Sequence, residues 1–242
     1  MSVLAIIPAR SGSKGIKKKN IKKLNNHPLL AYSICIALES KKINNVICST
    51  DTEEIKEIAQ EYGAKVPFLR PKGISNDNSR DIDFILHCIN FLKEQKQQLP
   101  ELIVLLRPTS PLRKLETLNN SIRKMQKYKQ YHSLRSVCEA KDTPYKMWKI
   151  DKVSNSLKPI LHLKNDPEPF NSPRQKLPSV YWQTGQIEII RLQTLIDYNS
   201  ISGKNIYPLI VDSQISVDID SISDFRLAEE KIKTSKDYFV IT

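Results

Sequence analysis

Apolar runs alternate with helical periodicity along the first 130 residues of the chain. Short runs typical of strands inside a sheet lie at residues 3–9, 45–49 and 101–106. Apolar positions recur at helical spacing over residues 28–40, 52–63, 80–97 and 114–129, and residues 65–70 are expected to be extended. Thr52 precedes two glutamates and is expected to cap the helix that it starts. This alternation predicts an α/β fold of three layers, with a mostly parallel sheet and helices on both faces.

The second half of the chain surrounds an irregular segment. We expect a strand at 133–139, extended segments at 206–219 and a last helix at about 221–234. Residues 140–180 contain six prolines and no sustained period, yet Trp148 and Phe170 are residues that a solvated linker would lack. The sequence therefore predicts a single domain over residues 1–242, with an inserted arm at about 140–180 that packs on another surface, such as a second subunit.

Composition limits the cellular setting. No apolar run approaches the roughly 18 residues that span a bilayer, and Arg10 interrupts the first run too early for a signal peptide. A cytoplasmic protein without a membrane contact is the expectation. The cysteines lie far apart inside apolar segments, without the spacing of a zinc site or a disulfide framework, and are predicted to be small core residues; they are Cys35, Cys48, Cys88 and Cys138.

A formal net charge of +12 points to an anionic partner. Nucleic acid, a membrane surface and a phosphorylated small substrate all satisfy it, and a general bias towards lysine accounts for much of it. A nucleic-acid-binding protein is disfavoured because the basic run from Lys14 to Lys19 has no interleaved aromatic residues and no groove-reading motif.

Three predicted strands end in polar or charged loops. The loops begin at Arg10, at Ser49 and at Arg107. Because ligands of open parallel sheets bind beyond the carboxyl ends of the strands, we expect these loops to converge on one cleft. The first loop combines small residues with cations, which suits a polyphosphate, but Ile16 follows Gly15 where a Walker A loop has lysine. The alternative is a solvated basic turn.

A pair of carboxylates lies near the end of the chain, in the sequence Ser-Val-Asp-Ile-Asp. Residues two apart on a strand face the same way, so Asp218 and Asp220 could hold one hard cation such as Mg²⁺. The alternative is a strand end whose second aspartate begins a helix cap. A phosphate-binding loop and a magnesium-type pair in one α/β domain are what nucleotidyl transfer requires.

Six segments of the chain, in order and spacing, resemble one known family. They are IIPARSGSKGIKKKN, STD, FLRPKGISND, LLRPTSPLR, SPRQKLP and SVDID. Together they are similar to the acylneuraminate cytidylyltransferases, the synthetases that join CMP to sialic acid and related 2-keto sugar acids. The resemblance extends from Ala5 to about Glu230. It implies CTP as a substrate, Mg²⁺ as the cofactor and no protein nucleophile.

The resemblance assigns the first loop to the nucleotide. It implies that CTP is bound by Arg10, Ser13, Lys14, Gly15, Lys19, Asn20, Arg70 and Asp77. Within this set, Lys19 and Arg10 would stabilise charge on the α-phosphate and on the departing pyrophosphate. Asp218 and Asp220 would bind Mg²⁺, and either Asp220 or a water on the metal would act as the general base.

The resemblance also implies a site for the sugar acid and a homodimer formed through the arm. The candidate substrate-binding residues are Arg107, Thr109, Ser110, Arg113, Lys146, Arg174, Gln175 and Gln186. Arg113, Lys146 and Arg174 are expected to grip the carboxylate of the sugar acid, although simple solvent exposure is an equal interpretation of the last two.

Two positions depart from the sialic acid pattern. Arg107 stands where sialic acid synthetases usually have glutamine, and Thr184 stands where they have asparagine before Gly185. These changes leave the family unaffected but favour a different nonulosonic acid, for example of the legionaminic or pseudaminic kind. Activation of ketodeoxyoctulosonate is the close alternative, and a catalytically lapsed binding subunit is a third.

Overall fold

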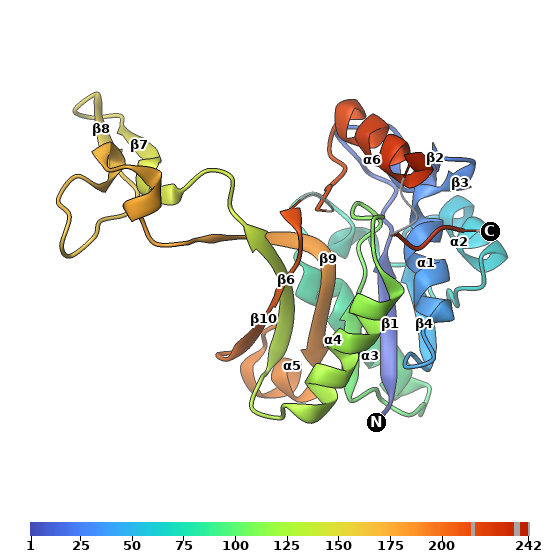
Figure 1. The fold of residues 1–242 in the computed structure, drawn as a ribbon. Helices are drawn as coiled ribbons and strands as arrows, with labels where there is room; N and C mark the ends of the chain where they lie inside the picture. Colours follow the sequence, from blue (N-terminus) through green and yellow to red (C-terminus); the bar gives the residue numbers. More distant parts are fainter. Residues whose placement is uncertain (214–215, 235–237, 242) are drawn as a thin grey trace.

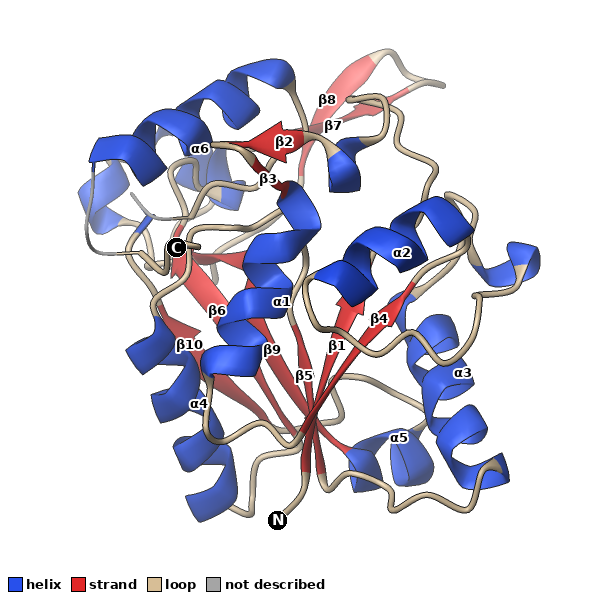
Figure 2. Ribbon diagram, turned by 90° about the vertical axis from the view of Figure 1, so that its right-hand side faces the viewer, coloured by secondary structure: helices blue, strands red, loops and turns tan. Residues whose placement is uncertain are grey.

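The computed structural model describes residues 1–213, 216–234 and 238–241. Its centre is a six-stranded sheet with the strand order β10-β6-β9-β5-β1-β4, shown edge to edge in Figure 2. The strands are β1 (Val3–Pro8), β4 (Asn45–Ser49), β5 (Leu102–Leu105), β6 (Ser133–Glu139), β9 (Tyr181–Arg191) and β10 (Ile206–Ile210). The helices are α1 (Leu29–Glu39), α2 (Glu53–Glu61), α3 (Asp81–Glu94), α4 (Leu115–Lys127), α5 (Leu192–Tyr198) and α6 (Ile222–Thr234).

The sheet is mixed but mostly parallel, which confirms the predicted fold class. β1 pairs in parallel with both β4 and β5, and β10 pairs in parallel with β6. β9 is antiparallel to both of its neighbours, β5 and β6. Its register against β6 shifts between the pairs Arg135–Glu188 and Val137–Gln183. This irregularity interrupts the period-2 pattern, and it explains why the sequence did not predict a strand here.

Alternate side chains of the central strands pack into two separate hydrophobic cores, one on each face of the sheet. Val3, Ala5 and Ile7 of β1 pack with buried residues of α1, α2 and α4 on one face. Leu4 and Ile6 pack with α3 and α5 on the other face. Because both faces of β1 are buried, its run of apolar residues is continuous, as a strand covered by helices on both sides requires.

A third core lies at the carboxyl ends of the strands. It joins α6 to a small hairpin, β2 (Lys23–Leu24) and β3 (His27–Pro28), and it includes Ile16, Val217 and Ile219. The first loop and the segment with the two aspartates are therefore anchored in the same apolar cluster. This packing brings residues about 200 positions apart in sequence to one edge of the sheet.

Most predicted elements are confirmed, with shifts at their ends. Thr52 caps α2 by accepting a hydrogen bond from the backbone N–H of Ile55 at 3.4 Å. Of the extended segments predicted over 206–219, Ile206–Ile210 form a strand and residues 216–219 do not; residues 214 and 215 lie outside the described residues. The four cysteines are free thiols, and three of them are buried. None of the described helices is long and apolar enough to cross a membrane.

Residues 140–180 extend away from the sheet, as Figure 1 shows. Their main element is a hairpin of β7 (Trp148–Asp151) and β8 (Ser156–Pro159). The rings of Trp148 and Phe170 lie 4.4 Å apart between centroids, so the segment has a small apolar contact of its own. Several of its apolar side chains remain exposed, including Ile150 at 68% and Leu157 at 58%.

Candidate functional site

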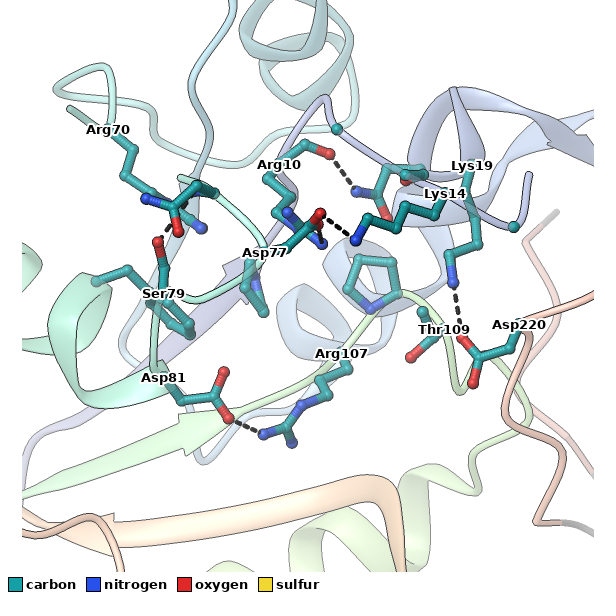
Figure 3. Close-up of a pocket in the computed structure, with 18 residues that line it drawn as sticks. Arg10, Lys14, Lys19, Arg70, Asp77, Ser79, Asp81, Arg107, Thr109 and Asp220 are labelled. Atoms are coloured by element: carbon teal, nitrogen blue, oxygen red, sulfur yellow. Dashed lines mark hydrogen bonds and ion pairs between the residues drawn. The ribbon is translucent and has the colours of Figure 1, made fainter. Parts of the chain in front are cut away.

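A cavity of about 510 Å³ lies beyond the carboxyl ends of β1 and β5 (Figure 3). The chain passes from β1 to β4 on one side and later to β5 on the other, so the connection order reverses here. Ligands of open α/β sheets bind at such switch points. The cavity brings together eleven of the predicted site residues: Arg10, Ser13, Lys14, Gly15, Lys19, Asn20, Arg70, Asp77, Arg107, Thr109 and Asp220.

The first loop is closed on itself and packed against the segment that carries Asp220. The buried Asn20 donates from its side-chain amide to the backbone oxygen of Arg10 at 2.8 Å. A Cβ atom on Gly15 would overlap the backbone oxygen of Asp220, so only glycine fits there. Glycine is needed at this position because two backbone segments approach each other closely. The next residue, Ile16, is buried and anchors this part of the loop.

Two cations of the loop share one carboxylate across the cavity. Arg10 Nη2 and Lys14 Nζ each lie 2.7 Å from an oxygen of Asp77. Hydrogen bonds from Lys14 and then Arg10 lower the pKa of Asp77. Both cations are thus directed at the same point, and a triphosphate that entered the cavity would compete with Asp77 for them.

Lys19 is directed at the aspartate segment. Its Nζ donates to the backbone oxygen of Ile219 at 2.7 Å and to Asp220 Oδ1 at 3.0 Å. The Lys19 side chain is 13% exposed, whereas that of Asp220 is 78% exposed. The backbone oxygen of Ile219 therefore holds the lysine in place, and the carboxylate of Asp220 faces the solvent side of the cavity.

The two aspartates of the predicted metal pair lie on an extended segment rather than on a strand. Val217 and Ile219 alternate with the two aspartates and are buried, whereas Asp218 and Asp220 are exposed. Asp220 lines the cavity, and Asp218 accepts from Ser110 Oγ at 3.5 Å outside the lining. Asp220 does not cap α6; Ser221 and Asp224 do so by exchanging hydrogen bonds.

Carboxylate oxygens are the donors that Mg²⁺ prefers, and it commonly takes one or two of them together with phosphate oxygens. Two outward-facing aspartates beside a loop of cations fit this requirement. The residues that the structure describes contain no cluster of three or more metal-ligating side chains. A magnesium ion here would depend on ligands from the nucleotide.

Arg70 forms a buried part of the wall. It is 5% exposed, and its guanidinium donates to the backbone oxygen of Ser49 at 2.6 Å and to Ser49 Oγ at 3.0 Å. The guanidinium also lies 4.6 Å from the centroid of the Phe84 ring. Burial lowers the pKa of Arg70 to about 10, which still leaves it cationic at neutral pH.

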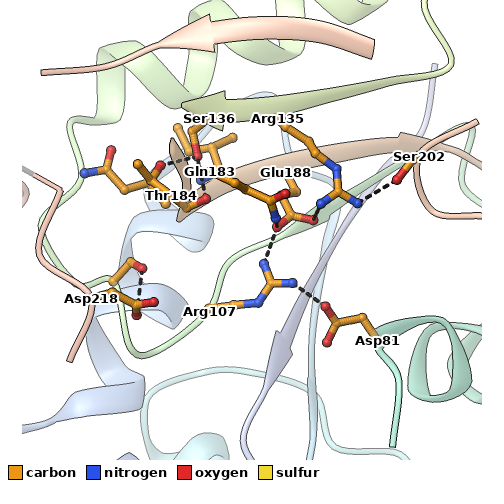
Figure 4. Close-up of polar contacts among 12 residues, drawn as sticks. Asp81, Arg107, Arg135, Ser136, Gln183, Thr184, Glu188, Ser202 and Asp218 are labelled. Carbon is orange, nitrogen blue, oxygen red and sulfur yellow. Dashed lines mark hydrogen bonds and ion pairs between the residues drawn. The ribbon is translucent and has the colours of Figure 1, made fainter. Parts of the chain in front are cut away.

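Arg107 is balanced by two carboxylates, as Figure 4 shows. Its Nη1 lies 2.5 Å from Glu188 Oε1, and its Nη2 contacts Asp81, the first residue of α3. Glu188 is 1% exposed, and its second oxygen lies 3.8 Å from Arg135. Burial lowers the pKa of Arg107, but Glu188 and Asp81 more than offset this, so the net direction is upward.

Replacing Glu188 by glutamine is expected to lower the free energy of unfolding by about 3 kcal/mol, because it leaves the guanidinium of Arg107 short of a buried partner. Urea denaturation followed by circular dichroism measures this, with E57Q on an exposed face of α2 as the control. In the double variant R107Q/E188Q the loss should be smaller than the sum of the two single losses. An additive result would show that the pair is not coupled.

The structure does not bring every predicted substrate residue into the cavity. Arg113 is 1% exposed, and it donates to backbone oxygens of Gln186 and Arg107 and to Ser33 Oγ. Burial lowers its pKa to about 9. The N–H groups of its guanidinium are therefore used to connect the chain segments at Arg107, Gln186 and Ser33, and they do not face a ligand. Ser110 and Gln186 are also buried.

Three predicted residues lie on or beside the arm. Lys146, Arg174 and Gln175 are exposed and outside the cavity lining of their own chain. Arg174 donates to the backbone oxygen of Ala140 at 2.9 Å, which places it at the base of the arm.

Sequence reasoning missed part of the wall. Further side chains on the segment before and at the start of α3 line the cavity: Asn76, Ser79, Asp81 and Phe84. The signal was present, because Asn76 and Ser79 lie on either side of Asp77, and Asp81 and Phe84 lie at the start of the helix that was predicted to follow. Asp51, which contacts the first loop, lies in the predicted loop after Ser49 but was not given a role of its own.

The whole chain is similar to known cytidylyltransferases. The model of the family described as cytidylyltransferase matches residues 4–232. The chain is 32% identical to CMP-N,N'-diacetyllegionaminic acid synthase of Legionella pneumophila, with 99% of this chain and 100% of that protein covered. It is also 32% identical to N-acylneuraminate cytidylyltransferase of Escherichia coli, with 93% of this chain and 51% of that protein covered.

The fold is shared more widely. A solved structure of CMP:2-keto-3-deoxy-manno-octonic acid synthetase complexed with CTP superposes with a TM-score of 0.70 at 14% identity, covering 96% of this chain and 99% of that one. At this identity the likeness concerns the fold alone. The match to the family model and the two sequence relatives identify the molecule: the chain belongs to the cytidylyltransferase family, and it is a nucleotidyltransferase that resembles the acylneuraminate cytidylyltransferases.

Proposed function

We propose that this cytidylyltransferase transfers CMP from CTP to the anomeric hydroxyl of a nonulosonic acid and releases pyrophosphate. One observation carries the proposal: at the switch point of the sheet, three cations of the first loop and Asp220 line a single cavity. A bond forms between the sugar oxygen and the α-phosphorus, and the bond from the α-phosphorus to the pyrophosphate oxygen breaks. The proton of the attacking hydroxyl passes to a base.

The side chains of the cavity have separate tasks in this reaction. Arg10, Lys14 and Lys19 bind phosphate oxygens and offset the negative charge that builds up on the leaving pyrophosphate. Gly15 and the neighbouring Ser13 let backbone N–H groups approach the same oxygens. Arg70, Asn20 and Asp77 complete the nucleotide site. Catalysis rests on positioning and charge and uses no covalent intermediate with the protein.

Asp218 and Asp220 are the proposed ligands for Mg²⁺. The ion would supply further charge neutralisation at the phosphates when it is bound. Asp220 is also the candidate acceptor for the proton of the attacking hydroxyl, because its carboxylate is exposed to the cavity and Lys19 orients it through a hydrogen bond.

The proposed sugar substrate is a nine-carbon keto-sugar acid of the legionaminic or sialic kind, since the relatives named for those substrates match nearly the entire chain. Arg107 does not provide an uncompensated cation for the sugar carboxylate, because Glu188 and Asp81 balance it. It would instead donate to a neutral polar group, together with Thr109 in the same lining. This wall supports a substrate other than plain N-acetylneuraminate.

A pyrophosphate-release assay tests the proposal. Purified protein, Mg²⁺ and each of the four ribonucleoside triphosphates are combined with legionaminic, pseudaminic, N-acetylneuraminic and ketodeoxyoctulosonic acids. The expected result is release with CTP and a nine-carbon acid. Preferred turnover of the eight-carbon acid would establish the alternative, and turnover with none of them, or equally with all triphosphates, would reject the proposal.

A homodimer formed through the arm is part of the proposal. Ile150 and Leu157 face each other across β7 and β8 and are both more than half exposed, as is Trp182 at the base of the arm. Exposed apolar side chains on a projecting segment are typical of an interface. Lys146 and Arg174 would then serve the sugar carboxylate in the cavity of the second copy, since they lie outside that of their own chain.

The double variant I150D/L157D is expected to be monomeric in sedimentation experiments at concentrations where the wild type is a dimer, because burying two carboxylates in an apolar interface is costly. It should also lose most of its kcat/KM for the sugar acid. The matched control is K149A/K158A, which changes the neighbouring pair of the same hairpin. An unchanged dimer in the aspartate variant would exclude the hairpin from the interface.

A further inference from the structure

Both carboxylate oxygens of Asp51 accept hydrogen bonds from the start of the first loop. Asp51 Oδ1 accepts from the backbone N–H of Ser11 at 2.7 Å, and Asp51 Oδ2 accepts from Ser11 Oγ at 2.8 Å. Neither residue was among the predicted site residues, and Asp51 does not line the main cavity. We infer that Asp51 is a positioning residue, which fixes the phosphate-binding loop in the geometry that receives the triphosphate of CTP.

The turn that carries Asp51 is itself held firmly. Ser49 ends β4 and pairs with Pro8 of β1, and its backbone oxygen accepts from the N–H of Ala9 at 3.0 Å. Thr50 is completely buried, and its backbone oxygen accepts from the N–H of Arg70 at 2.6 Å. The buried side chain of Arg70 adds two hydrogen bonds to Ser49. Asp51 therefore projects from a rigid turn between β4 and α2.

This turn joins the two walls of the cavity. On one side it is bonded to Arg70, which lines the wall near α3, and on the other it is bonded to Ser11, which follows Arg10. Arg10 is thus held relative to Arg70 from both sides, by the bond from Ala9 to Ser49 before it and by the two hydrogen bonds from Ser11 to Asp51 after it. A charged acceptor makes stronger hydrogen bonds than a neutral one, and here both oxygens are used.

The contact between Asp51 and Ser11 differs from the ion pairs that Asp77 forms with the same loop. Asp77 binds the side chains of Arg10 and Lys14 inside the cavity, where phosphate oxygens would compete for them. Asp51 binds a backbone N–H and a hydroxyl outside the lining, so the nucleotide need not displace it. The loop can therefore exchange its partners at Arg10 and Lys14 while its entry point stays fixed. This role rests on the proposed function of the loop as the triphosphate site.

The experiment compares D51A, D51N, S11A and S11A/D51A in the full-length protein. Binding of CTP is measured by calorimetry without sugar acid, and KM values are measured separately for CTP and for the sugar acid. E57A, on an exposed face of the following helix, is the control. D51A should weaken CTP binding and raise its KM about tenfold, with the KM for the sugar acid and the melting temperature nearly unchanged.

Two further results follow from the geometry. Asparagine can accept from the Ser11 N–H and donate to its hydroxyl, so D51N should stay within about threefold of the wild type. S11A/D51A should be no worse than D51A, because both changes remove the same contact. Equal CTP affinity of D51A and the wild type, or equal rises in both KM values, would overturn the inference. Failure of the wild type itself to bind CTP would instead reject the proposed function.

Discussion

Replacing Lys19 by alanine is expected to lower kcat about a thousandfold. Lys19 Nζ is held between the backbone oxygen of Ile219 and Asp220, so it meets the developing charge on the phosphates without having to reorganise. Preorganised donors of this kind contribute about a hundredfold to a thousandfold each. The variant should fold normally, because the lysine lies on a loop outside the three cores.

Steady-state turnover with saturating CTP and sugar acid measures this effect. K17A is the matched control: Lys17 is two residues away on the same loop, is exposed and is absent from the lining of the main cavity. Its rate should stay near that of the wild type. A K19A protein with a near-normal rate and a normal circular dichroism spectrum would show that Lys19 does not act on the reacting phosphates.

The second large effect is expected at Asp220. Replacing it by asparagine should lower kcat about a hundredfold, because the change removes a proposed ligand of Mg²⁺, the candidate base and the anionic partner of Lys19 in one step. The backbone oxygen that packs against Gly15 is retained, so the loop itself should not move.

A metal titration separates these roles. The concentration of Mg²⁺ that gives the half-maximal rate should rise strongly in D220N and less in D218N, because Asp220 lines the cavity and Asp218 does not. D197N, on the exposed surface of α5, is the control. An unchanged magnesium requirement in D220N would argue against Asp220 as a ligand, and an unchanged kcat would exclude it from catalysis.

The sequence predicted the parts of the site that follow directly from strand ends. The buried runs of β1 and β5 are continuous in apolar residues, and their parallel directions bring the loops after Pro8 and Leu105 to one edge. The placement of Asp220 beside Lys19 could not be derived in the same way. It depends on a core in which Ile16, Val217 and Ile219 meet, and such contacts have no local pattern.

The interpretation of Arg107 changed most. As a residue type in a predicted sugar site, it suggested a free cation beside the substrate. The partner that balances it, Glu188, lies on a strand whose irregular register hid it from pattern analysis. Arg113 is a similar case, because its long side chain turns into the interior, where it joins segments that are far apart in sequence. Residue type and spacing cannot reveal such buried partners.

The arm illustrates a different limit. Its aromatic and apolar residues predicted something other than a linker, and β7 and β8 form a hairpin that stands clear of the sheet in Figure 1. What covers its exposed face is a property of an assembly and not of one chain. The dimer and the role of Lys146 and Arg174 therefore remain proposals with their own test.

The most direct test of the account follows one oxygen atom. The sugar acid is labelled with ¹⁸O at its anomeric hydroxyl and incubated with CTP, Mg²⁺ and the wild-type protein, and both products are analysed by mass spectrometry before the label exchanges with water. Attack of the sugar on the α-phosphorus predicts that the label is retained in the CMP-sugar and that the pyrophosphate is unlabelled. Label in the pyrophosphate, or free CMP formed with oxygen from water, would contradict this reaction.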